Sequence, residues 1–202
     1  MKWCQLRSNP ERRRVLIDAA IEVLAREGAR GLTFRAVDGE AAVPAGTASN
    51  YFSNRDDLFT QIGGRIYERL LPDEATIAQS VGRAADGHAR YNELMREVVD
   101  RVSSFGSGQL ALVELRLEAT RRPPLRDVLT TRIRQDIDLN IANHVASGLP
   151  GDTMSVLILY LALNWLILER LTLPDLLTGD EVEAVIDTVV SRALNTADPA
   201  GA

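Results

Sequence analysis

Residues 33–59, TFRAVDGEAAVPAGTASNYFSNRDDLF, constrain the fold more than any other part of this chain of 202 residues. Thr33 can cap a short helix whose apolar residues recur at helical spacing. A tight turn is expected at residues 42–44, because the fixed φ of Pro44 suits the first turn of a following helix. The stretch therefore predicts two short helices joined by a tight turn.

The second short helix divides its residues between two faces. Ala48 and Phe52 lie four positions apart and share the inward face, whereas Gly46, Asn50 and Tyr51 are expected to point outward. A helix of this length is not stable by itself, so neighbouring helices must hold it. We therefore expect a helix-turn-helix whose second helix enters a groove of DNA.

Longer amphipathic helices are predicted on either side of this stretch. The first covers residues 10–27, carries an apolar stripe at helical spacing and ends at Gly28. The other begins at a capping box, S-x-x-D at residues 53–56, and continues to about residue 71. Together with the central stretch, these helices can enclose a small apolar core.

The order of these features is more specific than a bare helix-turn-helix. An apolar helix ending in glycine precedes a Thr-capped helix, a V-x-x-G-T turn, an aromatic–Phe pair and a Ser-x-basic-acidic-acidic-Leu entry to the next helix. Residues 11–59 thereby resemble the DNA-binding domain of the tetracycline-repressor (TetR) family of bacterial regulators. The segments that carry the resemblance are VLIDAAIEVLAREGARGLTFRAV and VPAGTASNYFSNRDDLF. Many members have Gly where this chain has Ala42, Ala where it has Asp38, and Tyr where it has Ser49.

The resemblance and the residue chemistry together predict the DNA contacts. Asn50 is the main candidate for base readout, because an amide can pair with adenine through two hydrogen bonds. Arg35 is expected to reach a guanine or a phosphate. Arg12, Arg13 and Arg14 form either a solvated face or an arm that touches phosphates. Residues expected at phosphates are Thr33, Thr47, Tyr51 and Arg55, and the face toward the bases comprises Pro44, Ala45, Gly46, Ser49 and Asn50.

The rest of the chain also predicts helices, so the fold class is all-α. Periodic apolar residues indicate helices at about 86–105, 109–122, 125–147, 153–170 and 180–194, whereas residues 73–85 are weakly patterned. We expect a helix-turn-helix DNA-binding domain over residues 1–54 and a helical effector-binding and dimerisation domain over residues 55–202. The helix at about 55–71 would link the two.

The segment MSVLILYLALNWLILERL is the most hydrophobic in the chain. A membrane span needs about 20 predominantly apolar residues, but this run contains Asn164, ends at Glu169 and Arg170 and lacks flanking basic clusters. We therefore expect it to pair with the last helix in a four-helix bundle between two copies, the alternative being an ordinary core. The predicted interface residues are Leu157, Leu161, Leu168, Val182, Val185, Ile186, Val189 and Val190.

Charge and composition narrow the possible functions. The net charge is −5, but residues 1–60 carry 9 basic and 8 acidic residues, and the remainder carries 14 and 20. The acidic excess therefore lies outside the part expected to bind DNA. One cysteine excludes an internal disulfide, and no secretion signal is seen, so a cytoplasmic location is expected. No catalytic constellation, cofactor motif or metal-ligand spacing is found, and we predict no enzyme activity, no cofactor and no metal.

The resemblance also implies a small-molecule pocket among the middle helices. Polar residues within apolar helices indicate its lining, because buried polar groups need partners. The effector is expected to be apolar or amphipathic. The candidate pocket residues are Tyr91, Met95, Phe105, Leu112, Arg116, Asn140, His144, Asn164 and Trp165.

These expectations describe a homodimeric regulator, a repressor in the first instance, that leaves a palindromic operator in double-stranded DNA when a small effector binds. The sequence does not distinguish repression from activation. The alternative function is a helical ligand-binding or scaffolding dimer without sequence-specific DNA binding.

Overall fold

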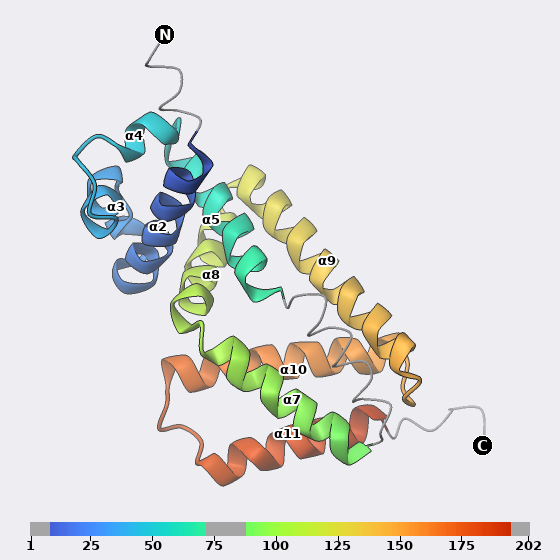
Figure 1. Ribbon diagram of the computed structural model, residues 1–202. Coiled ribbons are helices and arrows are strands. Elements are labelled where there is room, and N and C mark those ends of the chain that lie inside the picture. Colours follow the sequence, from blue (N-terminus) through green and yellow to red (C-terminus); the bar gives the residue numbers. More distant parts are fainter. Residues whose placement is uncertain (1–8, 72–87, 195–202) are drawn as a thin grey trace. The chain divides into compact units, whose positions relative to one another are not determined.

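A computed structural model describes residues 9–71 and 88–194, and within these ranges the regular structure is entirely helical (Figure 1). The all-α fold class is therefore confirmed. Its helices are α2 (Pro10–Gly31), α3 (Phe34–Glu40), α4 (Ala48–Tyr51), α5 (Arg55–Leu70), α7 (His88–Ser103), α8 (Gly106–Ala119), α9 (Pro123–Ser147), α10 (Thr153–Thr172) and α11 (Gly179–Leu194).

Several helix limits differ from the predicted ones. The bounds of α2 reach Gly31, but Gly28 is non-helical at φ 68°, so the regular helix ends at the predicted stop and a short turn follows it. The helix α8 starts at Gly106, inside the stretch that was predicted to be a break, and α4 has only four residues. Asn54, and not Ser53, caps α5 by accepting a hydrogen bond from the Asp57 N–H at 2.9 Å. The weakly patterned segment 73–85 lies outside the described residues.

The chain forms two compact units. Of the described residues, 9–71 and 106–132 form one unit, and 88–105 and 133–194 form the other. This division differs from the predicted boundary at residue 54, because α5 and α8 pack against α2 and share its core. The helices expected to bind DNA therefore belong to a unit that also contains α5 and α8.

The core of the first unit lies between α2, α5 and α8. Its central side chains are fully buried, as expected for apolar stripes that face one another. They are Leu16 and Leu24 of α2, Ile62 of α5 and Leu115 of α8. The Arg65 guanidinium adds a two-point contact with Asp18, with nitrogen–oxygen distances of 2.9 and 3.1 Å. Paired donors and acceptors of this kind fix the orientation of two helices.

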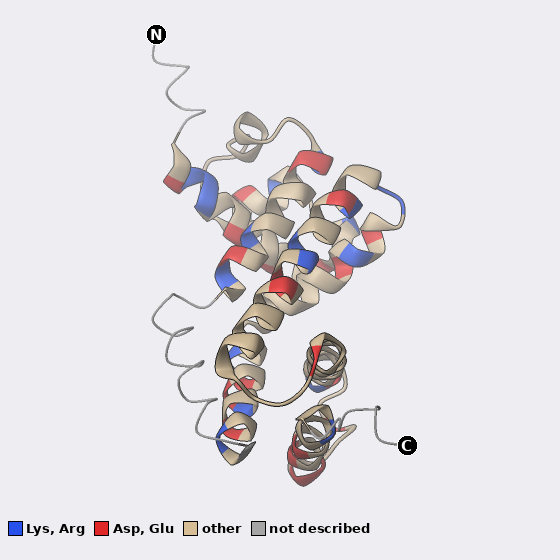
Figure 2. Cartoon of the chain, turned by 90° about the vertical axis from the view of Figure 1, so that its right-hand side faces the viewer, with Lys and Arg blue, Asp and Glu red and all other residues tan. Residues whose placement is uncertain are grey.

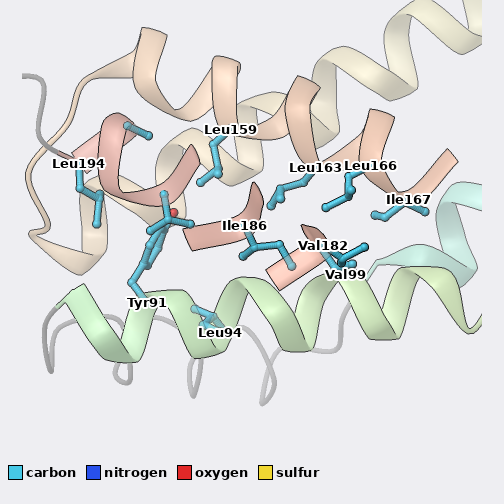
Figure 3. Close-up of a cluster of buried hydrophobic side chains, with 12 residues drawn as sticks. Tyr91, Leu94, Val99, Leu159, Leu163, Leu166, Ile167, Val182, Ile186 and Leu194 are labelled. Atoms are coloured by element: carbon cyan, nitrogen blue, oxygen red, sulfur yellow. The ribbon is translucent and has the colours of Figure 1, made fainter. Parts of the chain in front are cut away.

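The second unit is built around α7, α10 and α11. Figure 3 shows side chains of these three helices converging on one cluster, with Tyr91 and Leu94 from α7 opposite Leu159 from α10 and Ile186 from α11. At the start of α10, the Asp152 carboxylate and the Ser155 hydroxyl form a capping box. This cluster fixes the packing of the three helices.

The helix α10 is long and apolar enough to cross a membrane by length and composition, which for a single helix is weak evidence of a span, and 33% of its most hydrophobic window is buried in the chain. Leu159, Leu163 and Leu166 face the core cluster. The opposite side is apolar and exposed, which does not fit the alternative of an ordinary core within one chain. This side carries Met154, Ile158, Leu161 and Trp165, which are 57%, 53%, 58% and 63% exposed.

The turn between α3 and α4 contains an alanine in the left-handed region. Ala42 has φ 51° and is exposed, and Gly is the residue that adopts this conformation without a steric cost. Gly46, which follows in the same turn, has φ 88°. The turn therefore accommodates its single left-handed alanine at a cost in stability.

We predict that Ala42→Gly stabilises the protein. Removing the Cβ relieves about 1–2 kcal/mol of strain, of which ~0.4–1 kcal/mol is offset by the greater freedom of glycine in the unfolded chain. The free energy of unfolding should therefore rise by about 0.5–1 kcal/mol, measured by urea denaturation.

Ala36→Gly is the matched control, because Ala36 lies in α3 with helical geometry. It should destabilise the protein by about 1 kcal/mol. Equal destabilisation by both substitutions would contradict the assignment of strain to Ala42.

Candidate nucleic-acid interface

The helix α4, with its preceding turn, presents small and polar side chains on its exposed face. Ser49 and Asn50 are exposed, and both donate side-chain hydrogen bonds to the Gly46 carbonyl at 2.9 Å. The Thr47 hydroxyl donates to the Pro44 carbonyl at 2.5 Å. A contact between Asn50 and a base would require its side chain to give up this internal bond, which a rotation about its side-chain torsions permits.

Asp38 of α3 holds the beginning of this helix. Its Oδ2 atom accepts a hydrogen bond from the Gly46 N–H and its Oδ1 atom accepts one from the Ala48 N–H, both at 2.7 Å. The carboxylate is only 3% exposed. Buried carboxylates need such donors. The departure from the family pattern at position 38 therefore has a structural role.

The end of α4 is held by Arg13 of α2. The Arg13 guanidinium lies 5.7 Å from the ring centre of Tyr51 and 5.5 Å from that of Phe52, within the range of cation–π contacts. Tyr51 is 8% exposed, so the prediction that it faces outward with Asn50 is wrong. Its ring instead fills space beneath Arg13, which also shows that Arg13 is neither simply solvated nor a free arm.

A polar network continues from Arg13 into α5. Arg13 donates to Gln61 Oε1 at 2.8 Å, Gln61 donates to Asp57 Oδ1 at 2.6 Å, and Asp57 Oδ2 accepts from the backbone and hydroxyl of Ser53. Burial alone would raise the pKa of Asp57, but the bonds from Ser53 and Gln61 and the charge of Arg13 lower it below its ordinary value. An ionised Asp57 keeps the α4–α5 junction ordered.

The other predicted DNA-contact residues lie near this junction or on α3. Thr33 caps α3 by accepting from the Ala36 N–H at 3.1 Å, and Arg35 is exposed without an ion pair to any described residue. Arg55 is exposed and its guanidinium lies 5.2 Å from the ring centre of Phe59. Figure 2 shows further basic residues in the first turns of α2. Pro44, Ala45 and Gly46 are exposed in the turn.

The predicted pocket residues do not all belong to one unit. Leu112 is buried in the first unit and Arg116 is exposed there, whereas the remaining seven belong to the second unit. Tyr91 and His144 lie together, with ring centres 6.0 Å apart, and burial raises the pKa of Tyr91 to about 12. Both imidazole nitrogens of His144 are buried without a hydrogen-bond partner among the described residues.

Asn140, Trp165 and Asn164 are less enclosed. Asn140 and Trp165 are exposed, and the Asn164 amide donates to the Tyr160 carbonyl within α10. A separate cleft of about 370 Å³ between α7, α10 and α11 contains none of the predicted pocket residues. Its Arg96 and Arg170 side chains are paired with acidic residues of the same unit.

The predicted interface residues also divide into two groups. Val182, Ile186 and Val190 are buried within the second unit against α7 and α10, so they are not part of its surface. Leu161 is exposed, and the others are half-buried: Leu157, Leu168, Val185 and Val189. The periodicity of α11 correctly located its apolar face, but it did not show that this face packs against helices of the same chain. An apolar face has the same sequence pattern whether it packs against its own chain or against a second copy.

In the candidate nucleic-acid interface, the sequence did not reveal the supporting roles of Asp38 and Arg13. Asp38 was visible only as a departure from the family pattern, and a carboxylate inside a short apolar helix was the signal that a donor had to lie nearby. Arg13 was one of three consecutive arginines, which nothing in the sequence distinguishes from one another.

Within the described residues, no group of three or more His, Cys, Asp or Glu side chains could hold a metal ion.

Comparison with known proteins agrees with this geometry. The family described as "Bacterial regulatory proteins, tetR family" matches residues 16–62, and the "Tetracyclin repressor-like, C-terminal domain" matches residues 86–196. A nicotine-responsive transcriptional repressor, HdnoR from Paenarthrobacter nicotinovorans, is 27% identical over 61% of this chain and 62% of its own length. An uncharacterized HTH-type transcriptional regulator from Xanthobacter autotrophicus is 34% identical over 46% of each chain.

A solved structure is similar over nearly the whole chain. The multidrug binding protein EbrR, complexed with imidazole, is 26% identical with a TM-score of 0.62, covering 96% of this chain and 94% of its own. The chain spans less than two thirds of the length of the two curated relatives. The matches nevertheless cover both the helix-turn-helix and more than half of the chain. The protein belongs to the TetR family of bacterial regulatory proteins.

Proposed function

We propose that the protein is a homodimeric transcriptional repressor in the cytoplasm that binds a palindromic DNA operator through α4 and leaves it when a small effector binds the second unit. The observation that carries the proposal is the turn and helix at residues 44–51. They expose small and polar groups on one face while Asp38 and Arg13 hold the other. A helix of four residues held this firmly is suited to entering the major groove.

Selection of bound duplexes from random DNA, followed by band-shift assays, tests DNA binding. The wild-type protein should select a palindromic site. Asn50→Ala should weaken binding to that site by about 10- to 100-fold, since a good two-bond base contact contributes ~1–3 kcal/mol of discrimination. Arg35→Ala should lower the dependence of affinity on salt if Arg35 contacts a phosphate.

Gln135→Ala, an exposed amide on α9 far along the chain, is the control and should bind like the wild type. Tyr51→Phe is preferable to Tyr51→Ala, because it removes only the hydroxyl and leaves the buried ring under Arg13. Absence of any sequence-preferring, salt-sensitive complex would favour the alternative, a ligand-binding or scaffolding dimer.

The exposed apolar side of α10 supports a homodimer. Met154, Ile158, Leu161 and Trp165 are separated by four, three and four positions, so they form a continuous stripe along one face. An apolar stripe with a polar rim is typical of a subunit interface. A two-fold axis would bring two such stripes together and give two reading helices for a palindrome.

We predict that Leu161→Asp converts the dimer to a monomer in sedimentation experiments, because the substitution places a charge in the centre of the stripe. DNA affinity should fall with it. Leu117→Asp is the control, since Leu117 is 55% exposed on α8, outside the stripe. A dimer that persists in the Leu161 variant would exclude this face as the interface.

One side of α9 supports an amphipathic effector. Asp136, Asn140 and His144 recur every four positions and so share a face. Burial raises the pKa of Asp136, although a hydrogen bond from Tyr160 and the nearby charge of Arg101 act in the opposite direction. A half-buried carboxylate and a buried imidazole without a hydrogen-bond partner in the described part of the chain suit a small apolar molecule with a basic or hydrogen-bonding group. The names of the similar proteins, nicotine-responsive and multidrug binding, are compatible with such molecules.

A thermal-shift panel of lipophilic amines and neutral molecules of the same size tests this effector class. The amines should raise the melting temperature of the wild type and release it from DNA. Asp136→Asn should reduce the shift caused by amines more than that caused by neutral molecules. The control is Asp138→Asn, an exposed carboxylate on the same helix, and an equal effect of both substitutions would contradict a role for Asp136.

A further inference from the structure

The N-terminal cap of α4 comes from another helix. Thr47 occupies the N-cap position but makes no side-chain cap, because its hydroxyl donates to the Pro44 carbonyl. The two N–H groups on either side of it, those of Gly46 and Ala48, donate to the two carboxylate oxygens of Asp38. The start of the helix is therefore defined by α3 and not by its own residues.

Burial makes this contact difficult to replace. Asp38 is 3% exposed and Ala48 is 0% exposed, so water cannot easily take the place of the carboxylate. Hydrogen bonds to a charged acceptor are shorter and stronger than those between neutral groups. The backbone N–H of Val43 also donates to the Asp38 carbonyl at 3.0 Å, which ties the turn to the same residue.

The position of Gly46 in turn determines that of the exposed face. The Ser49 hydroxyl and the Asn50 amide both donate to the Gly46 carbonyl, and the Gly46 N–H is held by Asp38. A shift of Gly46 would therefore move the groups proposed to read DNA. No other side chain among the described residues contributes two hydrogen bonds to this segment.

We propose that Asp38 is a positioning residue for DNA readout, whose carboxylate holds α4 in the orientation that distinguishes the operator from other DNA. This inference rests on the proposed function of α4 in DNA binding. Asp38 itself touches no base, and it acts through the backbone of Gly46 and Ala48.

Charge alone leads to the opposite expectation. Asp38 is an anion close to the proposed DNA face, and DNA is a polyanion, so neutralising Asp38 should strengthen all DNA binding if long-range repulsion is its main effect. If the carboxylate positions the helix, neutralising it should weaken binding to the operator selectively. The two effects therefore predict opposite changes in the affinity for the operator when Asp38 is neutralised.

The test is Asp38→Asn, which keeps the size of the side chain but places an amide NH₂ against one of the two backbone donors. Affinity is measured for the duplex that the wild type selects from random DNA and for a scrambled duplex of equal length. We expect binding to the selected duplex to fall about 10- to 100-fold, as for loss of one or more base contacts. Binding to the scrambled duplex should stay the same or increase.

Hydrogen exchange gives an independent readout of the contact. The amides of Gly46 and Ala48 should be protected in the wild type and should exchange at least about tenfold faster in Asp38→Asn, since exchange reports local opening. If the variant is not folded at the assay temperature, Asp38→Asn is combined with Ala42→Gly, which relieves strain in the same turn.

Asp152→Asn is the matched control, because Asp152 is also a capping carboxylate but lies at the start of α10. It should leave the ratio of the two DNA affinities unchanged. A folded Asp38→Asn protein with wild-type selectivity, or with equal gains for both duplexes, would overturn the inference. A wild-type protein that selects no duplex would instead contradict the proposed function.

Discussion

A helix of four residues contains too few internal hydrogen bonds to determine its own orientation, so α4, the helix proposed to read DNA, depends on contacts from other helices. At the start of α4, a carboxylate from α3 accepts two backbone N–H groups. At its end, the rings of Tyr51 and Phe52 lie against the Arg13 guanidinium of α2. Both supports are polar or charged groups in a mostly buried setting, where such contacts are strong and directional.

The architecture was largely predictable from the sequence because apolar periodicity and caps are local signals. The cap at Asp152 and the helical stripes of α2 and α5 follow from residues close to one another in the chain. What the sequence does not predict are the contacts between residues that lie far apart in the chain. The stop predicted at Gly28 agrees with its non-helical φ of 68°, but the sequence does not show that the Ala29 N–H just beyond it donates to Glu114, which lies 85 positions away.

The sequence predicted which segment forms the candidate site, but not the directions in which its side chains point. Helical spacing placed Tyr51 beside Asn50 on an outward face, yet the helix ends at Tyr51 and the chain then becomes extended. The ring therefore turns toward Arg13 and is buried. Asp38 was visible as an unusual residue, but its partners lie across the turn, and spacing within α3 carries no information about them. Side-chain roles that cross an element boundary need the tertiary structure.

The family match to the C-terminal domain and the two compact units divide the chain differently. The family match at residues 86–196 includes α8, but α8 packs against α2 in the first unit. Ser107 donates to Glu22 at 2.8 Å and Glu114 accepts from the Ala29 N–H at 3.0 Å, so two hydrogen bonds join α8 to α2. Only residues 104 and 105 separate α7 from α8. A change in α7 therefore has a short covalent path to α8, and any displacement of α8 must either move α2 with it or break these two hydrogen bonds.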